Sequence, residues 1–179
     1  DEEIIVANKE GRAIRFNEQT VRTMGRNATG VRAMRIDEGD EVIGMVSVCN
    51  PEKDTVLVVS DQGYGKRSDV EDYRITNRGG KGVKTMNITD KTGKLVALKV
   101  VNDEDDLMII NVSGITLRLH TSDIRVMGRA TQGVRLINLS KRGDTIASIC
   151  RVPREDEENI NAETSEATTE DSDQPENDN

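Results

Sequence analysis

The side chains that could do chemistry in this sequence are mostly cationic, and they recur in three similar segments at residues 22–32, 74–84 and 125–135. Each segment keeps three cationic positions in register and places a glycine directly before an apolar residue. These glycines, Gly30, Gly82 and Gly133, are 52 and 51 residues apart, and such a fixed spacing marks a repeat architecture. Guanidinium groups, ammonium groups and backbone N–H groups of glycine loops can all bind phosphate. The segments therefore predict phosphate contacts.

If successive repeats pack side by side, their basic segments form a periodic track along one edge. A duplex that follows such a track must bend, and indirect readout would then set any sequence preference. The alternative is that these cations are ordinary solvated charges or turn residues paired with nearby acids. The candidate DNA-binding residues are Arg22, Arg26, Arg32, Arg74, Arg78, Lys81, Lys84, Arg125, Arg129 and Arg135. Arg15, Arg67 and Arg118 share another register, for which pairing with an aspartate between repeats is as reasonable as DNA contact.

The composition indicates how the chain would contact an anionic partner. Aromatic residues make up 2% of the chain and Trp is absent, so base stacking is not the expected mode of binding. The net charge of −8 hides an asymmetry, because residues 155–179 hold 11 acidic and no basic residues. The rest of the chain has a net charge of +3, which favours an anionic partner. We expect the acidic tail to be disordered, and it either solubilises the chain or competes with DNA for the basic edge.

Several classes of site are not expected. His120 is the only histidine, so a histidine triad or zinc site has no partners. No Walker motif is present. The acidic run at 103–106 matches no EF-hand loop, so we expect a solvated turn between blades there, with calcium binding as the alternative. Cys49 and Cys150 are predicted to be buried free thiols. No apolar run approaches the length of a membrane span. We therefore predict no catalytic residue, no metal site and no cofactor in this chain.

The pattern of apolar runs and glycine turns predicts four short strands in each repeat. The expected first strands are 4–6, 56–58 and 107–109; the second are 12–16, 64–68 and 115–119; the third are 31–36, 83–88 and 134–139; the fourth are 42–48, 95–101 and 145–152. Four strands in about 50 residues is the size of a propeller blade. The predicted divisions are blades at 1–54, 55–105 and 106–154, with the tail at 155–179. Because three blades cannot close a ring, we expect further blades before Asp1.

The repeated segment resembles the blade repeat of the C-terminal domain of the DNA gyrase A subunit. The resemblance rests on the pattern Gly-Arg-x-x-x-Gly-Val-Arg at 128–135, the preceding Asp123-Ile124-Arg125, and the stretch at 77–85. It covers residues 4–154 and implies an all-β, six-bladed β-pinwheel whose blades exchange strands. It also implies a perimeter that binds and bends duplex DNA to favour negative supercoiling.

The same resemblance implies a larger assembly. The parent would be an ATP-dependent type II topoisomerase of the bacterial cytoplasm, with two A subunits and two B subunits, which uses ATP and Mg²⁺ through other regions. The gyrase box of the family, Gln-Arg-Arg-Gly-Gly-Lys-Gly, is matched only at its end by Arg78-Gly79-Gly80-Lys81-Gly82. We interpret this as a degenerate copy in a later blade. Neither Tyr64 nor Tyr73 lies in anything that resembles the strand-cleaving region.

Two other interpretations remain open. The A subunit of topoisomerase IV has a related domain with more degenerate blades. A propeller of the chromosome-condensation-regulator type, which binds proteins, has repeats of similar length. In that case the basic segment would be structural.

Overall fold

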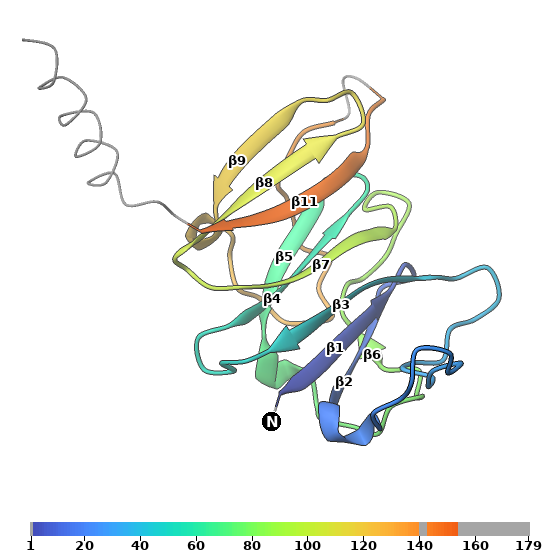
Figure 1. Cartoon of the computed structure of the whole chain (residues 1–179). Helices are drawn as coiled ribbons and strands as arrows, with labels where there is room; N and C mark the ends of the chain where they lie inside the picture. Colours follow the sequence, from blue (N-terminus) through green and yellow to red (C-terminus); the bar gives the residue numbers. More distant parts are fainter. Residues whose placement is uncertain (1, 140–142, 154–179) are drawn as a thin grey trace, which may run out of the picture.

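The computed structural model describes residues 2–139 and 143–153, and their regular structure is almost entirely β-strand (Figure 1). The strands are β1 (Glu3–Asn8), β2 (Arg12–Asn17), β3 (Val42–Val48), β4 (Thr55–Ser60), β5 (Tyr64–Asp69), β6 (Val83–Lys84), β7 (Leu95–Val101), β8 (Asp105–Asn111), β9 (Thr116–His120), β10 (Val134–Arg135) and β11 (Ile146–Pro153). The 3-10 helices are η1 (Glu18–Thr20), η2 (Val70–Asp72) and η3 (Thr121–Asp123). No helix in the described part of the chain is long and apolar enough to cross a membrane.

Each repeat opens with the antiparallel hairpin that the sequence predicts: β1 with β2, β4 with β5, and β8 with β9. In the first and third repeats, a side chain at the end of the first strand fixes the turn of the hairpin. Asn8 Oδ1 accepts a hydrogen bond from the backbone N–H of Arg12 at 2.7 Å. Asn111 Oδ1 accepts one from the N–H of Ile115 at 2.6 Å. Such a bond replaces a ladder hydrogen bond at the point where the chain reverses.

The sheets do not follow the repeats one to one. Their strand orders are β3-β1-β2-β6, β10-β5-β4-β7 and β11-β8-β9, which we call the first, second and third blade. The outermost strand of the first blade, β6, comes from the second repeat and pairs antiparallel with β2. Likewise β10 comes from the third repeat and pairs with β5 of the second blade. Neighbouring blades therefore exchange strands, as the resemblance implied.

Strand exchange also corrects the prediction of four strands in every repeat. Residues 31–36, expected to be a strand, are not one, and the third blade has three strands among the described residues. Both differences have the same reason, because the outermost strand of a blade comes from the following repeat. A third strand needs the second strand of the preceding repeat as its partner, and the first repeat has no preceding repeat in this chain. The corresponding strands β6 and β10 are also shorter than expected, at two residues each.

The core lies between the blades. Val56 and Val58 of β4 pack in one cluster with Ile5 of the first blade. Leu57 and Val59, which point to the opposite side of β4, pack in a second cluster with residues of β8. Because successive side chains of a strand alternate, one strand of the second blade serves both interfaces. The inner strands β3, β7 and β11 contact one another in sequence, which leaves β6 and β10 at the outer edge (Figure 1).

Arg15 and Arg67 join each blade to the next repeat. The Nη1 atom of Arg15 donates to the carbonyl oxygens of Val70 and Tyr73, each at 2.9 Å. The Nε atom of Arg67 donates to the carbonyl oxygen of Ile124 at 2.8 Å. Both side chains are buried, so both arginines are structural, and the alternative of DNA contact does not apply to them.

Carboxylates complete the charge balance of these arginines. Arg15 pairs with Glu3 and with Glu71 at 3.1 Å. Arg67 pairs with Asp103 at 2.7 Å, so the expected pairing with aspartate is found there, in addition to the bond to a backbone carbonyl.

The third arginine of this register differs. Arg118 is half exposed and pairs with the buried carboxylate of Asp106 at 2.7 Å, on the neighbouring strand of its own blade. His120 bonds the same carboxylate at 2.7 Å, and the hydrogen bonds from His120 and Arg118 lower the pKa of Asp106 to about 2. The acidic run at 103–106 is therefore not a wholly solvated turn, because its last two residues are buried at the start of β8.

The prediction of two buried thiols is wrong. Cys49 and Cys150 are free but exposed. Both line a cavity of about 730 Å³ on the inner side of the arc, together with Lys53, Lys99 and Arg151. Cys49 directly follows β3, and Cys150 lies within β11 opposite Met108; neither belongs to the apolar clusters between blades.

A buried lysine links the second blade to the third repeat. Lys66 of β5 is fully buried, and its Nζ donates to the carbonyl oxygen of Gly128 at 2.9 Å, to that of Arg129, and to Ser68 Oγ at 3.1 Å. Burial lowers the pKa of Lys66 to about 8. Ile14 and Leu117 hold the matching positions of the other repeats, so the lysine is a local departure from an apolar register.

We expect alanine at Gly82 to destabilise the fold far more than alanine at Gly30. Both glycines have positive φ, at 70° and 87°, which costs a residue with a Cβ roughly 1–2 kcal/mol. A Cβ at Gly82 would also lie 2.3 Å from the carbonyl oxygen of Ala13, whereas one at Gly30 would meet nothing within 4 Å. This overlap should add about 1–3 kcal/mol to the loss. Urea unfolding of the two variants tests the difference, and equal losses would contradict the strand-exchange geometry.

The lysine predicts a pH dependence of stability. Its pKa falls from 10.5 to about 8 on folding, so between these values the unfolded chain binds more protons than the folded one. Stability contributed by this group therefore rises with pH over that window. The control is Lys66→Leu, which copies the third repeat. We expect the free energy of unfolding of the wild type to rise from about pH 8 to about pH 10 relative to that of the variant. A constant difference across this range would show that Lys66 has an ordinary pKa.

Candidate nucleic-acid interface

The three basic segments lie at the outer ends of the blades. In the second and third repeats they carry β6 and β10, the strands farthest from the inner strands β3, β7 and β11. We call the segments 22–32, 74–84 and 125–135 the edge segments. Nine of their ten cations occupy three registers, and the structure gives each register a different role; the tenth, Lys81, lies outside them.

The first register is free. Arg22, Arg74 and Arg125 are all exposed, and their side chains contact no acid or carbonyl group within the described residues. Each follows the 3-10 helix of its repeat, which turns the chain from the hairpin into the edge segment. One unpaired guanidinium is therefore presented in every repeat. This is the arrangement that phosphate contact requires, because such a group loses no internal partner on binding.

The second register is structural in two of its three copies. Arg78 donates from Nε to the carbonyl oxygen of Thr20 at 3.1 Å and from Nη1 to that of Arg32 at 3.3 Å. Arg129 donates in the same way to Asp72 at 3.1 Å and to Lys84 at 2.7 Å. The two acceptor pairs occupy matching positions one repeat apart, so each arginine fastens its own edge segment to the preceding one.

Arg26 is the first copy of this second register. No repeat precedes it in the chain, and its side chain is exposed. Of the predicted DNA ligands, Arg78 and Arg129 thus each have two of their five N–H donors engaged inside the protein, while no such bond of Arg26 is found within the described residues.

The third register is mixed. Arg32 is exposed, and Lys84 makes one long contact of 3.5 Å to Asn87. Arg135 lies 5.4 Å from the ring centroid of Tyr64 and donates to its hydroxyl at 3.0 Å, which lowers the pKa of Tyr64. These two contacts hold the guanidinium of Arg135 against the tyrosine, while the residue stays exposed at the edge.

Lys81 is the remaining predicted ligand. It forms an exposed ion pair with Asp37 at 3.0 Å. Exposed pairs of this kind contribute little and exchange readily, so phosphate could replace Asp37. Lys81 and Arg74 line one hollow of about 280 Å³ beside Gly80 and Gly82.

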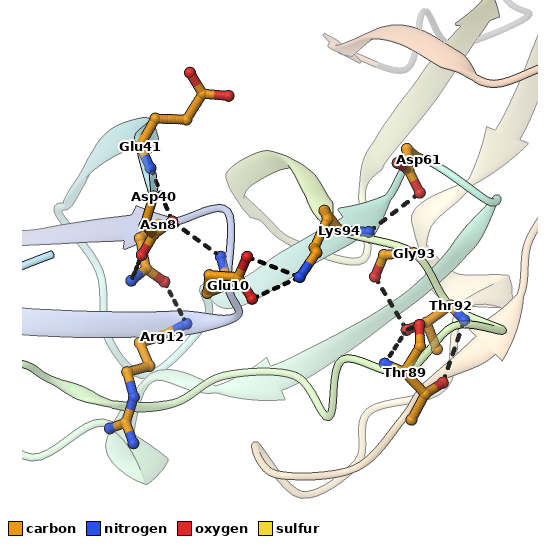
Figure 2. A network of polar contacts seen from close by, with 10 residues as sticks. All are labelled: Asn8, Glu10, Arg12, Asp40, Glu41, Asp61, Thr89, Thr92, Gly93 and Lys94. Carbon is orange, nitrogen blue, oxygen red and sulfur yellow. Dashed lines mark hydrogen bonds and ion pairs between the residues drawn. The ribbon is translucent and has the colours of Figure 1, made fainter. Parts of the chain in front are cut away.

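A second hollow at the edge is lined by the cations Arg12, Lys84 and Lys94 together with the acids Glu10 and Asp90. It measures about 560 Å³ and lies beside a polar network that joins the turns of the first and second repeats. Figure 2 shows the Lys94 ammonium reaching both carboxylate oxygens of Glu10, each at 2.7 Å. Asn8 donates to Asp40 at 2.6 Å in the same network, and Asp61 accepts from the Lys94 backbone N–H at 3.2 Å (Figure 2). Glu10 therefore neutralises Lys94 and positions the turns, whereas Arg12 and Lys84 of the same hollow form no ion pair within the described residues.

Sequence reasoning missed two features of the interface. Lys66 supports the third edge segment from inside, and the only signal for it was a lysine in an otherwise apolar register. Tyr64 carries cations on its ring, with Lys91 at 5.6 Å as well as Arg135. Within the described residues no cluster of three or more metal-ligating side chains was found.

The sequence of this chain is similar to those of known proteins. The family described as "DNA gyrase C-terminal domain, beta-propeller" matches residues 2–49, 54–102 and 105–152. The DNA gyrase A subunit of Staphylococcus aureus strain NCTC 8325 / PS 47 is 43% identical over 170 residues, which cover 94% of this chain and 19% of that protein. The corresponding protein from strain MRSA252 is 44% identical over 170 residues, with 95% and 19% covered. The chain thus spans about a fifth of the length of these relatives.

Solved structures agree with this assignment. The DNA gyrase A C-terminal domain superposes with a TM-score of 0.77 at 28% identity, over 84% of this chain and 50% of that one. The C-terminal domain of DNA topoisomerase IV superposes with a TM-score of 0.80 over 94% of this chain and 52% of that one, and its 21% identity shows the fold alone. Three in-register repeats, exchanged outer strands and a family match over each repeat lead to one conclusion: the chain belongs to the DNA gyrase C-terminal domain family of β-propellers.

Proposed function

We propose that this chain binds duplex DNA along its outer edge and bends it, as the wrapping domain of the DNA gyrase A protein. The observation that carries the proposal is the free register, in which Arg22, Arg74 and Arg125 each present a guanidinium that has no partner among residues 2–139 and 143–153. A structural arginine would be bonded inside the fold, as Arg78 and Arg129 are. The exposed arginines recur at matching positions, next to arginines that are bonded inside the fold. This arrangement fits the binding of one external anion that extends across all three repeats.

The geometry of the arc supports bending. The blades share cores and inner contacts on one side, so the outer edge follows the convex side of the arc (Figure 1). A stiff duplex that contacts all three edge segments must curve with them, which costs elastic energy that the phosphate contacts must offset. Contacts of this kind position DNA without reading its sequence.

The wider role follows from the relatives, which are gyrase A subunits. The proposed parent is a bacterial, cytoplasmic type II topoisomerase that couples wrapping to ATP-dependent negative supercoiling. Its partners are a second A subunit and the gyrase B subunit. ATP and Mg²⁺ act in other regions, and this chain itself contributes DNA binding and no catalysis.

Topoisomerase IV is the second candidate, because its C-terminal domain has the same fold. The sequence favours gyrase, since gyrase A subunits are 43% identical to this chain. Family membership also favours DNA over the protein partner of an interaction propeller, which stays as one outcome of the following test.

Replacing the free arginines should weaken DNA binding and flatten its salt dependence. We expect Arg22→Ala, Arg74→Ala and Arg125→Ala each to reduce the slope of log K against log salt by about 0.9, the value for one phosphate contact. The measurement is fluorescence anisotropy of a labelled duplex with residues 1–179 over a range of salt concentrations.

Lys53→Ala and Lys99→Ala are the matched controls. Each substitution also removes one positive charge, but from the inner cavity that these lysines line. They should leave the slope almost unchanged. Equal effects of edge and inner substitutions would reduce the contacts to general charge attraction. Absence of DNA binding by the folded wild type at every salt concentration would favour the interaction propeller.

A further inference from the structure

Two aliphatic side chains stand beside the free arginines. Ile75 is 56% exposed and follows Arg74 directly; Val126 is 38% exposed and follows Arg125. A single exposed aliphatic residue needs no explanation. These two, however, hold matching positions in successive repeats, each next to a guanidinium that has no partner among the described residues. In the first repeat the position is Thr23, which has the same branched shape with a hydroxyl in place of a methyl group.

The backbone holds both residues firmly at the outer edge. Ile75 forms a parallel bridge with Arg15, and Val126 forms one with Arg67. The next N–H group in each case donates to the carbonyl oxygen of that same arginine, from Thr76 to Arg15 and from Met127 to Arg67, both at 2.9 Å. Because Arg15 and Arg67 are buried at the blade junctions, the aliphatic groups are fixed to the most constrained part of the fold. They are presented rigidly and do not lie on a mobile loop tip.

We propose that Ile75 and Val126 contact the deoxyribose walls of the minor groove and so locate the bends of the DNA that the edge carries. The proposal rests on the function proposed above. Phosphates offer no partner for an aliphatic group, whereas the minor groove is lined by the C–H faces of the sugars. A narrow minor groove also concentrates negative potential and attracts arginine, so an Arg-aliphatic pair fits it better than either residue alone. Where a duplex wraps around a protein, as on the histone octamer, arginine side chains enter the minor groove each time that groove faces the protein.

The spacing of the two Arg-aliphatic pairs predicts where the minor groove faces the protein. Arg74-Ile75 and Arg125-Val126 recur once per repeat, so the minor groove should face the protein at two points separated by one blade. The bases most tolerant of bending should be preferred at those points, although no base edge is read. The first repeat, with Thr23, should bend DNA less than the others.

The test uses residues 1–179 with the variants Ile75→Thr and Val126→Thr, singly and together. Threonine keeps the branched shape and already occupies this register at Thr23, so the fold should be retained, which circular dichroism and thermal unfolding verify. Val112→Thr is the matched control, because Val112 is 68% exposed but lies outside the edge segments. Bending is measured by energy transfer between dyes at the two ends of a duplex, and minor-groove contact by hydroxyl-radical footprinting.

We expect the double variant to bind with the wild-type salt slope, to lose roughly three- to tenfold in affinity, and to bend the duplex less. Two protected stretches of the minor groove should fade with it. Thr23→Val should strengthen bending. If the double variant bends and protects DNA as the wild type does, the inference is wrong while the proposed function stands. If Arg74→Ala and Arg125→Ala also leave binding unchanged, the proposed function itself fails.

Discussion

Everything in this structure depends on how the open edge of each hairpin is closed. The second strands β2 and β5 present unpaired backbone groups on one side, and only the following repeat satisfies them. The pairing itself is two residues long, too short to persist alone. Arginines supply the remaining attachment: Arg15 and Arg67 from the hairpin side, and Arg78 and Arg129 from the edge-segment side. Positively charged side chains thus hold together a surface whose remaining cations face solvent.

Much of the fold could be predicted from the sequence, because it depends on local patterns. Alternating apolar residues and a glycine turn are enough to identify the hairpins β1-β2 and β4-β5. The partner of a strand is not a local property, and nothing in residues 31–36 themselves tells whether a preceding hairpin is available. The exposed thiols of Cys49 and Cys150 illustrate the same limit, since the sequence pattern does not show where the inner strand β3 ends or which face of β11 another blade covers.

The candidate site was predictable as a set of cations but not as a set of roles. Arg74 and Arg78 look equivalent in the sequence, since both recur in register three times. The structure separates them, because Arg78 reaches the carbonyl oxygens of Thr20 and Arg32 in the preceding repeat, whereas Arg74 reaches no carbonyl oxygen of the described residues. Such a distinction depends on contacts between residues about fifty positions apart. The acidic tail at 155–179, expected to be disordered, lies outside the described residues, and the blade divisions at 54/55 and 105/106 stay a prediction.

The two junctions use the same bonds at positions one repeat apart. Thr76 and Met127 donate to matching arginine carbonyls, and Arg78 and Arg129 grip matching acceptors. The main strand contacts between repeats thus run from each repeat to the next, as nearest-neighbour contacts do in repeat proteins: β6 with β2, β10 with β5, β3 with β7, and β7 with β11. Gene duplication of one unit would add a blade and a junction of unchanged geometry. The number of blades can then change in evolution while the curvature of the arc stays the same. The length of DNA that the outer edge can carry would change with the number of blades.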